Sequence, residues 1–313
     1  MLTQSEFAER ANRHRHELQV HCYRMLASFE EAEDLVQETL LRAWRRREDL
    51  DREEHLRAWL YKIATNACLD TVKAKNRRVA SLGSFRDLPW LEPYPDRLLE
   101  PEAPTSDEPD TALIGRETIE LTFLAVIQLL PPRQRAVLIL REVLDWPAAE
   151  VAELLEIGVA AVNSALQRAR ATLREHLPAE DREDWSNPRE VTETERGVLE
   201  RYMAAHESGD PQETLALIRD DIRVTMPPAP YLFEGRAAIL ELLERSAGTG
   251  EWRLLPTRAN RQPAAGCYLR APGDTAFRAF KIDVLRIVDG AIAEATTFGA
   301  KHFAAFDLPA VLP

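Results

Sequence analysis

The sequence has 313 residues, of which 45% are hydrophobic and 29% charged, and its formal net charge is −12 at pH 7. This is the composition of a globular protein, which excludes wholesale disorder, and the length allows two or three domains with cores of their own. The longest apolar runs, such as 121–130, are too short and too interrupted to span a bilayer, and the first residues lack the pattern of a signal peptide. We therefore expect a cytoplasmic protein.

The cysteines and the distribution of charge further restrict the classes of function that this chain can have. Cys22, Cys68 and Cys267 show neither CxxC nor Cys/His ligand spacing, which predicts buried structural thiols and no metal, cofactor or disulfide framework. The acidic excess lies mainly in 87–120 and 180–195, whereas basic residues cluster in 62–78 and 168–174. Because local fields decide where phosphate can sit, the negative total does not exclude nucleic acid.

The first two predicted helices cover 5–28 and 30–47. The second has an apolar stripe at three-and-four spacing, which predicts a core face. That stripe consists of Ala32, Leu35, Val36, Thr39, Leu40 and Ala43. Its opposite face carries Leu41 and Trp44 among charges, a composition typical of a docking surface, although a solvated face would also carry charges.

The run AEDLVQETLLRAW at 32–44 resembles, almost residue for residue, the core-polymerase-binding helix of extracytoplasmic-function sigma factors of bacteria. The resemblance implies that this helix docks on the clamp helices of the RNA polymerase β′ subunit. The implied contact residues are Asp34, Gln37, Glu38, Leu41 and Trp44.

A third predicted helix covers 55–75. Its apolar stripe consists of Leu56, Leu60, Ile63, Ala64, Ala67 and Thr71. The other face interleaves basic, aromatic and amide groups, which suits single-stranded nucleic acid, because cations hold phosphates and aromatics stack on unpaired bases. The residues of this face are Arg57, Tyr61, Lys62, Thr65, Asn66, Lys73 and Arg77. The segment LRAWLYKIATN at 56–66 resembles the promoter-melting, −10-reading helix of the same family, whose base-capturing loop would correspond to 50–55.

Residues 79–116 are acidic, contain prolines and lack periodicity, which predicts a linker. Within it, 90–99 reads WLEPYPDRLL and combines aromatic, apolar and proline residues. Two interpretations stay open for this segment: docking on a folded surface, either of this chain or of the polymerase, or loose packing. A similar motif occurs in sigma factors that carry an extra C-terminal domain.

A helix at 111–130 precedes a second helical group. The prolines at 131–132 suit a helix start, Asp145 is a candidate N-cap for a short helix over 148–157, and Gly158 supplies the turn into a longer basic helix at 159–177. A short helix, a glycine-containing turn and a longer basic helix predict a helix-turn-helix.

The run LPPRQRAV at 130–137, followed by this helix pair, resembles the −35-reading domain of sigma factors. Asn and Gln can pair with adenine and Arg with guanine. The residues expected at DNA are Ala161, Asn163, Ser164, Gln167, Arg168, Arg170 and Arg174, the last two toward phosphates. Relatives often have Lys or Arg at the positions of Asn163 and Ala165, so fewer phosphate contacts are expected here.

After a second acidic linker the pattern changes. Helices are predicted at 193–207, 211–218 and 236–245, and strands at 221–226, 252–258, 266–270, 276–286 and 291–298. Asp289-Gly290 is a strong hairpin signal. Helices followed by a meander predict an α+β roll.

The stretches 199–206, 220–221 and 233–239 resemble the SnoaL-like, nuclear-transport-factor-two-like fold. In such a roll we expect a candidate pocket for a small molecule. Its candidate lining residues are Tyr202, His206, Asp221, Arg223 and Tyr268. A His and an Asp could act as acid and base, but their spacing matches no catalytic set, so no enzyme activity is expected.

The sequence thus predicts a multidomain chain, two all-α domains followed by an α+β roll. The expected divisions are 1–78 for sigma region 2, 79–116 for the linker, 117–178 for sigma region 4, 179–192 for the second linker and 193–313 for the SnoaL-like domain. The expected partners are the β′ and β subunits of core RNA polymerase, promoter DNA and a small-molecule ligand of the roll. The roll itself would modulate initiation in cis. Two alternatives remain: a helix-turn-helix repressor or activator with a ligand-sensing roll, and an enzyme in the roll.

Overall fold

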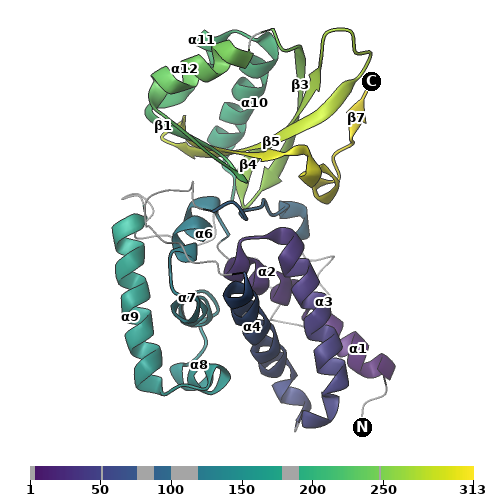
Figure 1. Ribbon diagram of the computed structural model, residues 1–313, viewed down its shortest axis with the longest axis vertical. Coiled ribbons are helices and arrows are strands. Elements are labelled where there is room, and N and C mark those ends of the chain that lie inside the picture. The colour runs from purple at the N-terminus through teal and green to yellow at the C-terminus, as the bar shows by residue number, and fades with distance from the viewer. Residues whose placement is uncertain (1–3, 51, 76–87, 100–118, 178–189, 247) are drawn as a thin grey trace. The chain divides into compact units, whose positions relative to one another are not determined.

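The computed structural model describes residues 4–50, 52–75, 88–99, 119–177, 190–246 and 248–313 (Figure 1). The chain divides into two compact units. Unit 1 combines Met1–Leu82 with Ala103–Pro188, and unit 2 combines Gly83–Glu102 with Arg189–Pro313. Part of the predicted linker therefore belongs to unit 2. Arg77 and the predicted helical turns at 111–118 lie outside the described residues.

Unit 1 begins with four α-helices. They are α1 (Gln4–Arg13), α2 (Arg15–Leu26), α3 (Phe29–Arg45) and α4 (Leu56–Ala74), with short 3-10 turns η1 (Arg47–Asp49) and η2 (Glu53–His55) between the last two. The single helix predicted at 5–28 is wrong, because the chain turns at His14 and separates α1 from α2. Ala27 then adopts a left-handed φ of 57°, which ends α2 before Ser28 caps α3.

The second half of unit 1 holds α6 (Leu121–Gln128), α7 (Pro132–Leu138), a π-helical turn η5 (Ile139–Val143), α8 (Ala148–Leu155) and α9 (Val159–His176). Figure 1 shows α7 between α4 and α9, with which it is in contact. The predicted capping role of Asp145 is wrong. Asp145 has a φ of 53°, and Pro147 occupies the N-cap position of α8.

Arg135 joins the two halves of unit 1. Its side chain is 3% exposed, and its guanidinium donates to the backbone carbonyls of Ile127 and Gln128 at 2.9 and 2.8 Å. It also donates to the carbonyl of Met25 near the end of α2. One buried cation thus satisfies carbonyls at the ends of two helices, which stabilises their packing because unpaired buried carbonyls are costly.

Unit 2 is a roll built on a seven-stranded sheet of order β2-β1-β6-β5-β4-β3, with β7 on β5. Its strands are β1 (Ile218–Met226), β2 (Ala229–Glu234), β3 (Glu251–Ala259), β4 (Gln262–Arg270), β5 (Phe277–Val288), β6 (Ala291–Gly299) and β7 (Val311–Leu312). The predicted strands are present and mostly longer, whereas β2 and β7 were not predicted. Asp289 and Gly290 have φ values of 51° and 75°, which confirms the predicted tight turn between β5 and β6.

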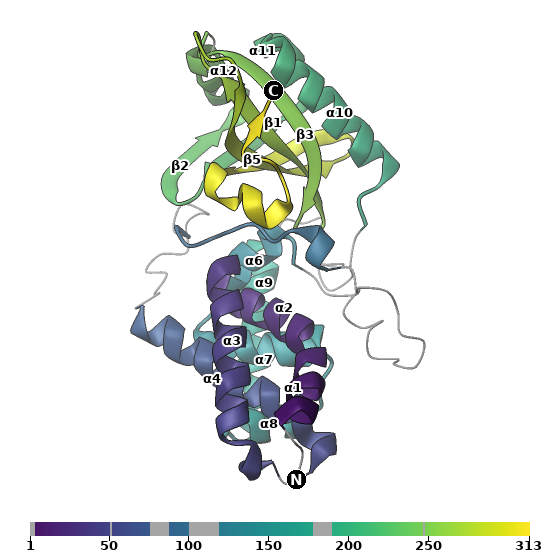
Figure 2. The ribbon, with the colours of Figure 1, turned by 90° about the vertical axis from the view of Figure 1, so that its right-hand side faces the viewer.

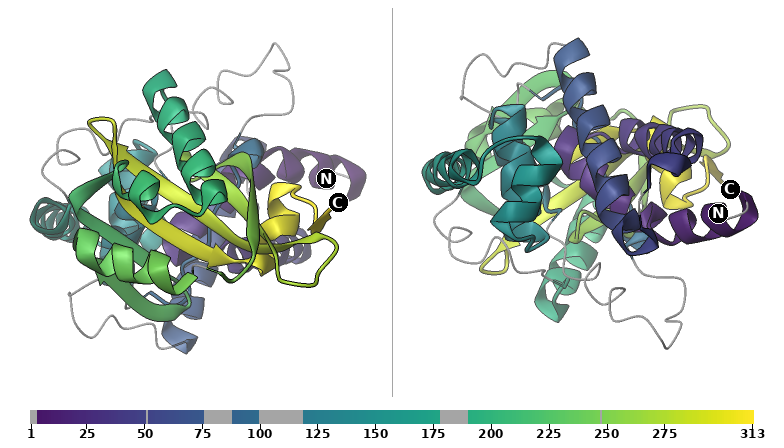
Figure 3. Two further views of the ribbon diagram at one scale, coloured as in Figure 1. Left: turned by 90° about the horizontal axis from the view of Figure 1, so that it is seen from above. Right: turned by 90° about the horizontal axis from the view of Figure 1, so that it is seen from below.

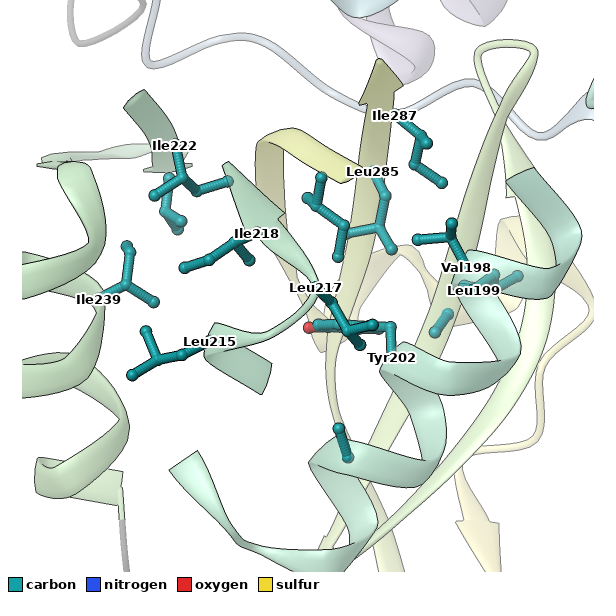
Figure 4. Close-up of a cluster of buried hydrophobic side chains, with 14 of the residues drawn as sticks. Val198, Leu199, Tyr202, Leu215, Leu217, Ile218, Ile222, Ile239, Leu285 and Ile287 are labelled. Atoms are coloured by element: carbon teal, nitrogen blue, oxygen red, sulfur yellow. The ribbon is translucent and has the colours of Figure 1, made fainter. Parts of the chain in front are cut away.

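The helices of unit 2 are α10 (Glu193–Ser208), α11 (Pro211–Leu215) and α12 (Gly235–Ser246), followed late in the chain by the 3-10 helix η7 (Ala300–Phe306). Figure 3 (left) shows α10 and α12 lying across one face of the curved sheet. Between them and the strands lies the core of Figure 4, which includes Val198 and Tyr202 from α10, Ile239 from α12 and Leu285 from β5. All three cysteines of the chain are buried, as predicted.

The faces of β4 alternate as a strand requires. Ala265 and Cys267 point into the core below the helices. Gly266 faces the other way, where an added Cβ would lie 2.6 Å from the Leu308 side chain, so only glycine fits without a shift there. Phe303 of η7 lies 3.5 Å from the same Cβ position, so η7 packs on the face opposite α10 and α12.

The segment 88–99, with the 3-10 turn η4 (Asp96–Leu98), belongs to the roll. Tyr94 and Asn260 are joined by two hydrogen bonds: the Tyr94 amide donates to Asn260 Oδ1 at 2.8 Å, and the Asn260 amide donates to the Tyr94 carbonyl at 2.9 Å. Pro95 forms a β-bridge to Ala259. Figure 2 shows this blue segment running beside η7.

Among the described residues, no helix combines the length and the apolar character that crossing a membrane requires.

Candidate functional site

The α3 helix presents the first candidate surface. Ser28 Oγ accepts a hydrogen bond from the Glu31 amide at 3.3 Å and so caps the helix. The predicted core stripe points inward: Ala32, Val36, Thr39 and Ala43 are buried, whereas Leu35 and Leu40 are half-buried. On the outer face Asp34 and Gln37 are exposed, and Leu41 is 51% exposed.

Two residues of that α3 surface are held in place by neighbours. Glu38 pairs with Arg42 at 2.7 Å, and both are partly exposed. The half-buried ring of Trp44 lies against Phe7 of α1, with ring centroids 5.7 Å apart, and the Arg47 guanidinium lies 4.1 Å from its centroid. Trp44 therefore forms an ordered edge of the surface beside the exposed Leu41.

The α4 helix places its predicted nucleic-acid residues unevenly. Asn66 and Lys73 are exposed, and Lys62 and Arg57 are half-buried. Tyr61 and Thr65 are 0% exposed, so their predicted position on the outer face of α4 is wrong in this structure. Helical spacing places them beside the charged residues. In the structure this part of α4 is covered by α2 and by the second helical group, which consists of the elements from α6 to α9.

A buried polar cluster explains the positions of Tyr61 and Arg57. Glu17 of α2 is 6% exposed and accepts two hydrogen bonds from the Arg57 guanidinium at 2.9 and 2.8 Å and one from the Tyr61 hydroxyl at 3.1 Å. Burial alone would raise the pKa of Glu17, but hydrogen bonds from His14 and Arg57 lower it. A buried carboxylate requires such partners, so these side chains hold one another inside unit 1.

Thr65 has a separate buried partner. Its Oγ1 lies 2.9 Å from Nε2 of His21, in a hydrogen bond between α4 and α2. Burial and the nearby Arg24 lower the pKa of His21 to about 3, so the ring is neutral at pH 7. Around Tyr61 and Thr65, the polar face of α4 therefore forms hydrogen bonds to α2 inside unit 1.

Residues of the second helical group cover the same stretch of α4. The Trp146 ring lies 5.1 Å from the Tyr61 ring, and the Arg57 guanidinium lies 5.9 Å from the Trp146 centroid. Lys62 pairs with Glu156, at the end of α8, at 3.0 Å. In this conformation three of the predicted nucleic-acid residues of α4 contact the second helical group.

The α8 and α9 helices form the predicted helix-turn-helix. Glu156 adopts a left-handed φ of 55° as the C-cap of α8, and Gly158 is the N-cap of α9. Val162, Ala165, Leu166 and Ala169 face the core. The exposed face of α9 carries these predicted DNA-reading residues: Ala161, Asn163, Ser164, Gln167, Arg168 and Arg174.

Two arginines of α9 have partners within unit 1. Arg168 donates to Ser164 Oγ at 2.6 Å along the exposed face, which fixes its direction. Arg170 is half-buried and forms an ion pair with Glu142 of η5, so its predicted direction toward phosphates is wrong in this structure. No local pattern indicates that pair, because Glu142 is 28 residues away from Arg170.

The interior of unit 2 contains a polar cluster centred on Asp283, which was not predicted. Asp283 is 1% exposed and accepts hydrogen bonds from the Tyr202 hydroxyl at 2.8 Å and the Thr297 hydroxyl at 2.6 Å, while Lys281 Nζ lies at 2.8 Å. Burial alone would raise the pKa of Asp283, but Lys281 and the hydrogen bonds lower it to about 2. The sequence signal that could have predicted this cluster is the single acid, Asp283, within the largely apolar strand sequence FKIDVLRIV at 280–288.

His206 lies beside this cluster. Its ring centroid is 5.6 Å from that of Tyr202 and 5.0 Å from that of Trp252. Burial and the nearby Lys281 lower the pKa of His206 to about 4, so the ring is neutral at pH 7. His206 is also among the residues lining a small cavity of about 110 Å³.

The other three predicted pocket residues lie elsewhere. Asp221 is exposed and pairs with Arg219 at 2.8 Å, and Arg223 pairs with Glu234 at 3.4 Å on the neighbouring strand. Tyr268 is 0% exposed and packs against Phe303 of η7, on the opposite face of the sheet from the helices. The predicted five-residue pocket is therefore wrong: Tyr202 and His206 come together, and the others do not join them.

Comparisons with known proteins agree with this arrangement. Residues 11–78 match the family Sigma-70 region 2, residues 120–173 match Sigma-70, region 4, and residues 199–295 match the SnoaL-like domain. The ECF RNA polymerase sigma factor SigG of Mycobacterium tuberculosis is 38% identical over 97% of this chain and 84% of that protein. SigW of Bacillus subtilis is 28% identical over 56% of this chain and 90% of that protein.

Among solved structures, the extracytoplasmic-function sigma factor SigJ of Mycobacterium tuberculosis has the same fold, with a TM-score of 0.64 at 22% identity over 98% of this chain and 100% of that chain. Two helical sigma regions followed by a SnoaL-like roll define a transcription initiation factor with an added α+β domain. The chain belongs to the extracytoplasmic-function RNA polymerase sigma factors. As an alternative sigma factor it binds core RNA polymerase and promoter DNA, and its task is initiation rather than an enzymatic reaction.

Proposed function

We propose that the exposed surface of α3 is where this sigma factor binds the β′ subunit of core polymerase. The surface consists of Asp34, Gln37, Glu38, Leu41 and Trp44. Its support is the half-exposed Leu41 beside the ordered Trp44, since apolar side chains framed by charges are typical of a binding surface. Because a sigma factor acts on promoter DNA, we place the protein in the cytoplasm.

We further propose that α9 reads the −35 element through Asn163, Ser164, Gln167 and Arg168, and that α4 acts on the −10 element through Asn66, Lys73 and Lys62. Arg57, Tyr61 and Lys62 would contribute fully only after the second helical group leaves α4. Thr65 would contribute only after its hydrogen bond to His21 of α2 breaks. Opening breaks the Lys62–Glu156 ion pair and the Tyr61–Trp146 contact. The described conformation is thus proposed to be a closed state of the sigma regions.

The C-terminal roll is proposed to regulate this opening in cis. The observation that carries the proposal is the pair of hydrogen bonds between Tyr94 and Asn260, which ties the connection between sigma regions 2 and 4 to the roll. Lys301 adds an ion pair with Glu92 at 2.7 Å. While 88–99 is bound to the roll, it is withheld from the polymerase and the free connector is shorter.

Shortening a connector raises the effective concentration of one tethered domain at the other. Docking of 88–99 should therefore favour the closed state, and its release should favour promoter binding. A ligand of the roll would act as the input to this equilibrium. No turnover is proposed for the roll, since Asp283 is held ionised by donors and His206 is neutral, which leaves no matched acid and base.

Single-round run-off transcription with core polymerase tests the regulatory proposal. Asn260→Gly removes the side-chain acceptor for the Tyr94 amide and tolerates the φ of 55° at this position. Asn260→Asp keeps an acceptor and serves as the matched control. We expect the Gly variant to raise initiation by about twofold or more, because a lost hydrogen bond costs about 1 kcal/mol of docking. Equal initiation from wild type and Asn260→Gly would overturn the proposal.

A further inference from the structure

Unit 2 contains a cavity of about 400 Å³ that neither the sigma regions nor the polar cluster around Asp283 accounts for. We call it the linker pocket. Its walls come from the segment 88–99, from α10 with the residues just before it, from β3 and β4, and from η7. The volume lies within the range of about 300 to 1,000 Å³ that small-molecule sites occupy.

One part of the linker pocket is apolar and built of buried side chains. Leu199 of α10 is 6% exposed and Phe306 of η7 is 5% exposed, and Pro263 of β4 is also buried. These side chains come from three separate elements of unit 2 and converge on one space. They can cover an aliphatic or aromatic group and gain free energy from the apolar area removed from water.

The rest of the linker pocket is cationic. Arg97, Arg196 and Arg258 line it and are exposed, and no carboxylate is among its described lining residues. The Arg97 guanidinium donates to the Ala305 carbonyl at 3.1 and 2.7 Å and forms an ion pair with the exposed Asp307 at 3.1 Å, and these contacts fix its position at the wall.

Arginine is suited to this site because its planar guanidinium can bind a carboxylate through two parallel hydrogen bonds. Arg196 forms an ion pair with Glu193, whose side chain is 90% exposed. Exposed pairs of this kind contribute little. Arg196 can therefore exchange Glu193 for a ligand anion at small cost, and Arg97 can exchange the exposed Asp307 in the same way.

We infer that the linker pocket binds an amphipathic organic carboxylate, with its apolar body against Leu199, Pro263 and Phe306 and its anionic group at the arginines. The match lies in the charge: exposed arginines that can exchange their surface partners, next to an apolar floor, complement one anion on an apolar body. A neutral molecule of the same shape would bury the same area without the charge-assisted hydrogen bonds.

The position of the linker pocket couples the ligand to segment 88–99. Pro95 and Arg97 of that segment form one wall, so a bound carboxylate contacts both the segment and the roll. A ligand that binds only the docked form stabilises docking as its concentration rises above its Kd. Binding itself is independent of the regulatory proposal, and only the effect on transcription rests on it.

Isothermal titration of the full chain with decanoate tests the pocket, with decanol as the neutral probe of matched chain length. Thr257 of β3 also lines the pocket and is half-buried. Thr257→Glu places a carboxylate there, and Thr257→Gln is its uncharged counterpart of similar size. We expect one decanoate per chain, binding about tenfold or more weaker in Thr257→Glu than in Thr257→Gln, since like charges repel at close range.

A second pair of variants tests the arginines directly. Arg196→Gln with Arg258→Gln should weaken decanoate binding by about tenfold or more, because charge-assisted hydrogen bonds are lost. Arg201→Gln, an exposed position of α10 outside the pocket lining, should leave it unchanged. Decanol binding as tight as decanoate, no saturable decanoate binding, or equal affinity in all variants would each overturn the inference.

Run-off transcription with and without decanoate separates the two proposals. If wild type responds and Thr257→Glu does not, both the pocket and its coupling to initiation are supported. If decanoate binds in the predicted way but transcription does not respond, the coupling is overturned and the pocket stands.

Discussion

The side-chain oxygen of Asn260 accepts a hydrogen bond from the Tyr94 amide, 166 residues earlier in the chain. Asn260 belongs to the turn between β3 and β4, and Tyr94 belongs to the connection between sigma regions 2 and 4. The Arg261 amide of the same turn donates to Asp96 Oδ1 at 2.8 Å. One turn of the roll therefore binds the connector at two places, the backbone of Tyr94 and the carboxylate of Asp96.

Hydrogen exchange should detect the loosening of this contact. In Asn260→Gly the Tyr94 amide loses its acceptor, and we expect it to exchange about fivefold faster or more, since the docking free energy falls by about 1 kcal/mol. Asn260→Asp should retain protection. Amides in β5, far from the connector in sequence, serve as the internal reference. Unchanged Tyr94 exchange in the Gly variant would show that other contacts dominate docking.

Arg135 offers a test of the packing between the two sigma regions. Arg135→Met removes the donor to the carbonyls of Met25, Ile127 and Gln128 and leaves them buried. We expect unit 1 to lose about 2 to 4 kcal/mol of unfolding free energy, measured by urea denaturation. Arg133→Met, at an exposed position of the same helix, should change stability by less than about 0.5 kcal/mol. Equal effects of the two variants would contradict this role for Arg135.

The α3 surface predicts a selective loss of polymerase binding. Asp34→Ala with Gln37→Ala should weaken binding to core polymerase by about tenfold, because both side chains are exposed on the proposed contact face. Glu33→Ala changes another exposed residue of α3 and is the matched control. Affinity can be followed by fluorescence anisotropy of labelled protein. Full affinity in the double variant, with the fold intact by circular dichroism, would remove α3 from the interface.

The α9 helix distinguishes reading residues from structural ones. Gln167→Ala should cost about 1 to 3 kcal/mol of discrimination at one base position of the −35 element. Arg174→Ala should weaken binding of all sequences alike, since an exposed arginine at the end of α9 can contact only the backbone in the proposed docking. Arg170→Ala should instead lower stability, because Arg170 pairs with Glu142. Competition binding with substituted promoter fragments separates these outcomes.

Local patterns were sufficient for much of the fold. The apolar stripe of α3 and the turn at Asp289-Gly290 depend on residues close in sequence, so their prediction was confirmed. The predicted position of Tyr61 on the outer face of α4 was wrong because its burial depends on Glu17 and Trp146, which lie in other parts of unit 1. Helical periodicity reports which face a residue occupies and not which element will cover that face.

The roll shows the same limit at its polar groups. Tyr202 and His206 are four residues apart on α10, so a common location could be inferred from spacing. Asp283 joins them only through the packing of β5 below α10, and Tyr268 is turned to the other face of the sheet. The docking of 88–99 was left open in the sequence because its partners, Ala259 and Asn260, are more than 160 residues away.

His206 predicts a specific pH dependence of the stability of unit 2. Its pKa is about 4 in the folded protein and about 6.5 in an unfolded chain. The unfolded state therefore binds more protons, and the contribution of His206 to stability is present above about pH 6.5 and is lost as the pH falls toward 4. Between pH 7.5 and pH 5.5 we expect His206 alone to lower the unfolding free energy by about 1 kcal/mol.

His206→Phe keeps an aromatic ring beside Tyr202 and Trp252 but cannot titrate. Its unfolding free energy should fall less between pH 7.5 and pH 5.5 than that of wild type, by about 1 kcal/mol. His302, whose pKa burial also lowers to about 4, titrates in both proteins and cancels in the difference. Parallel pH profiles for the two proteins would mean that His206 is protonated equally in the folded and unfolded states, contrary to its burial beside Lys281.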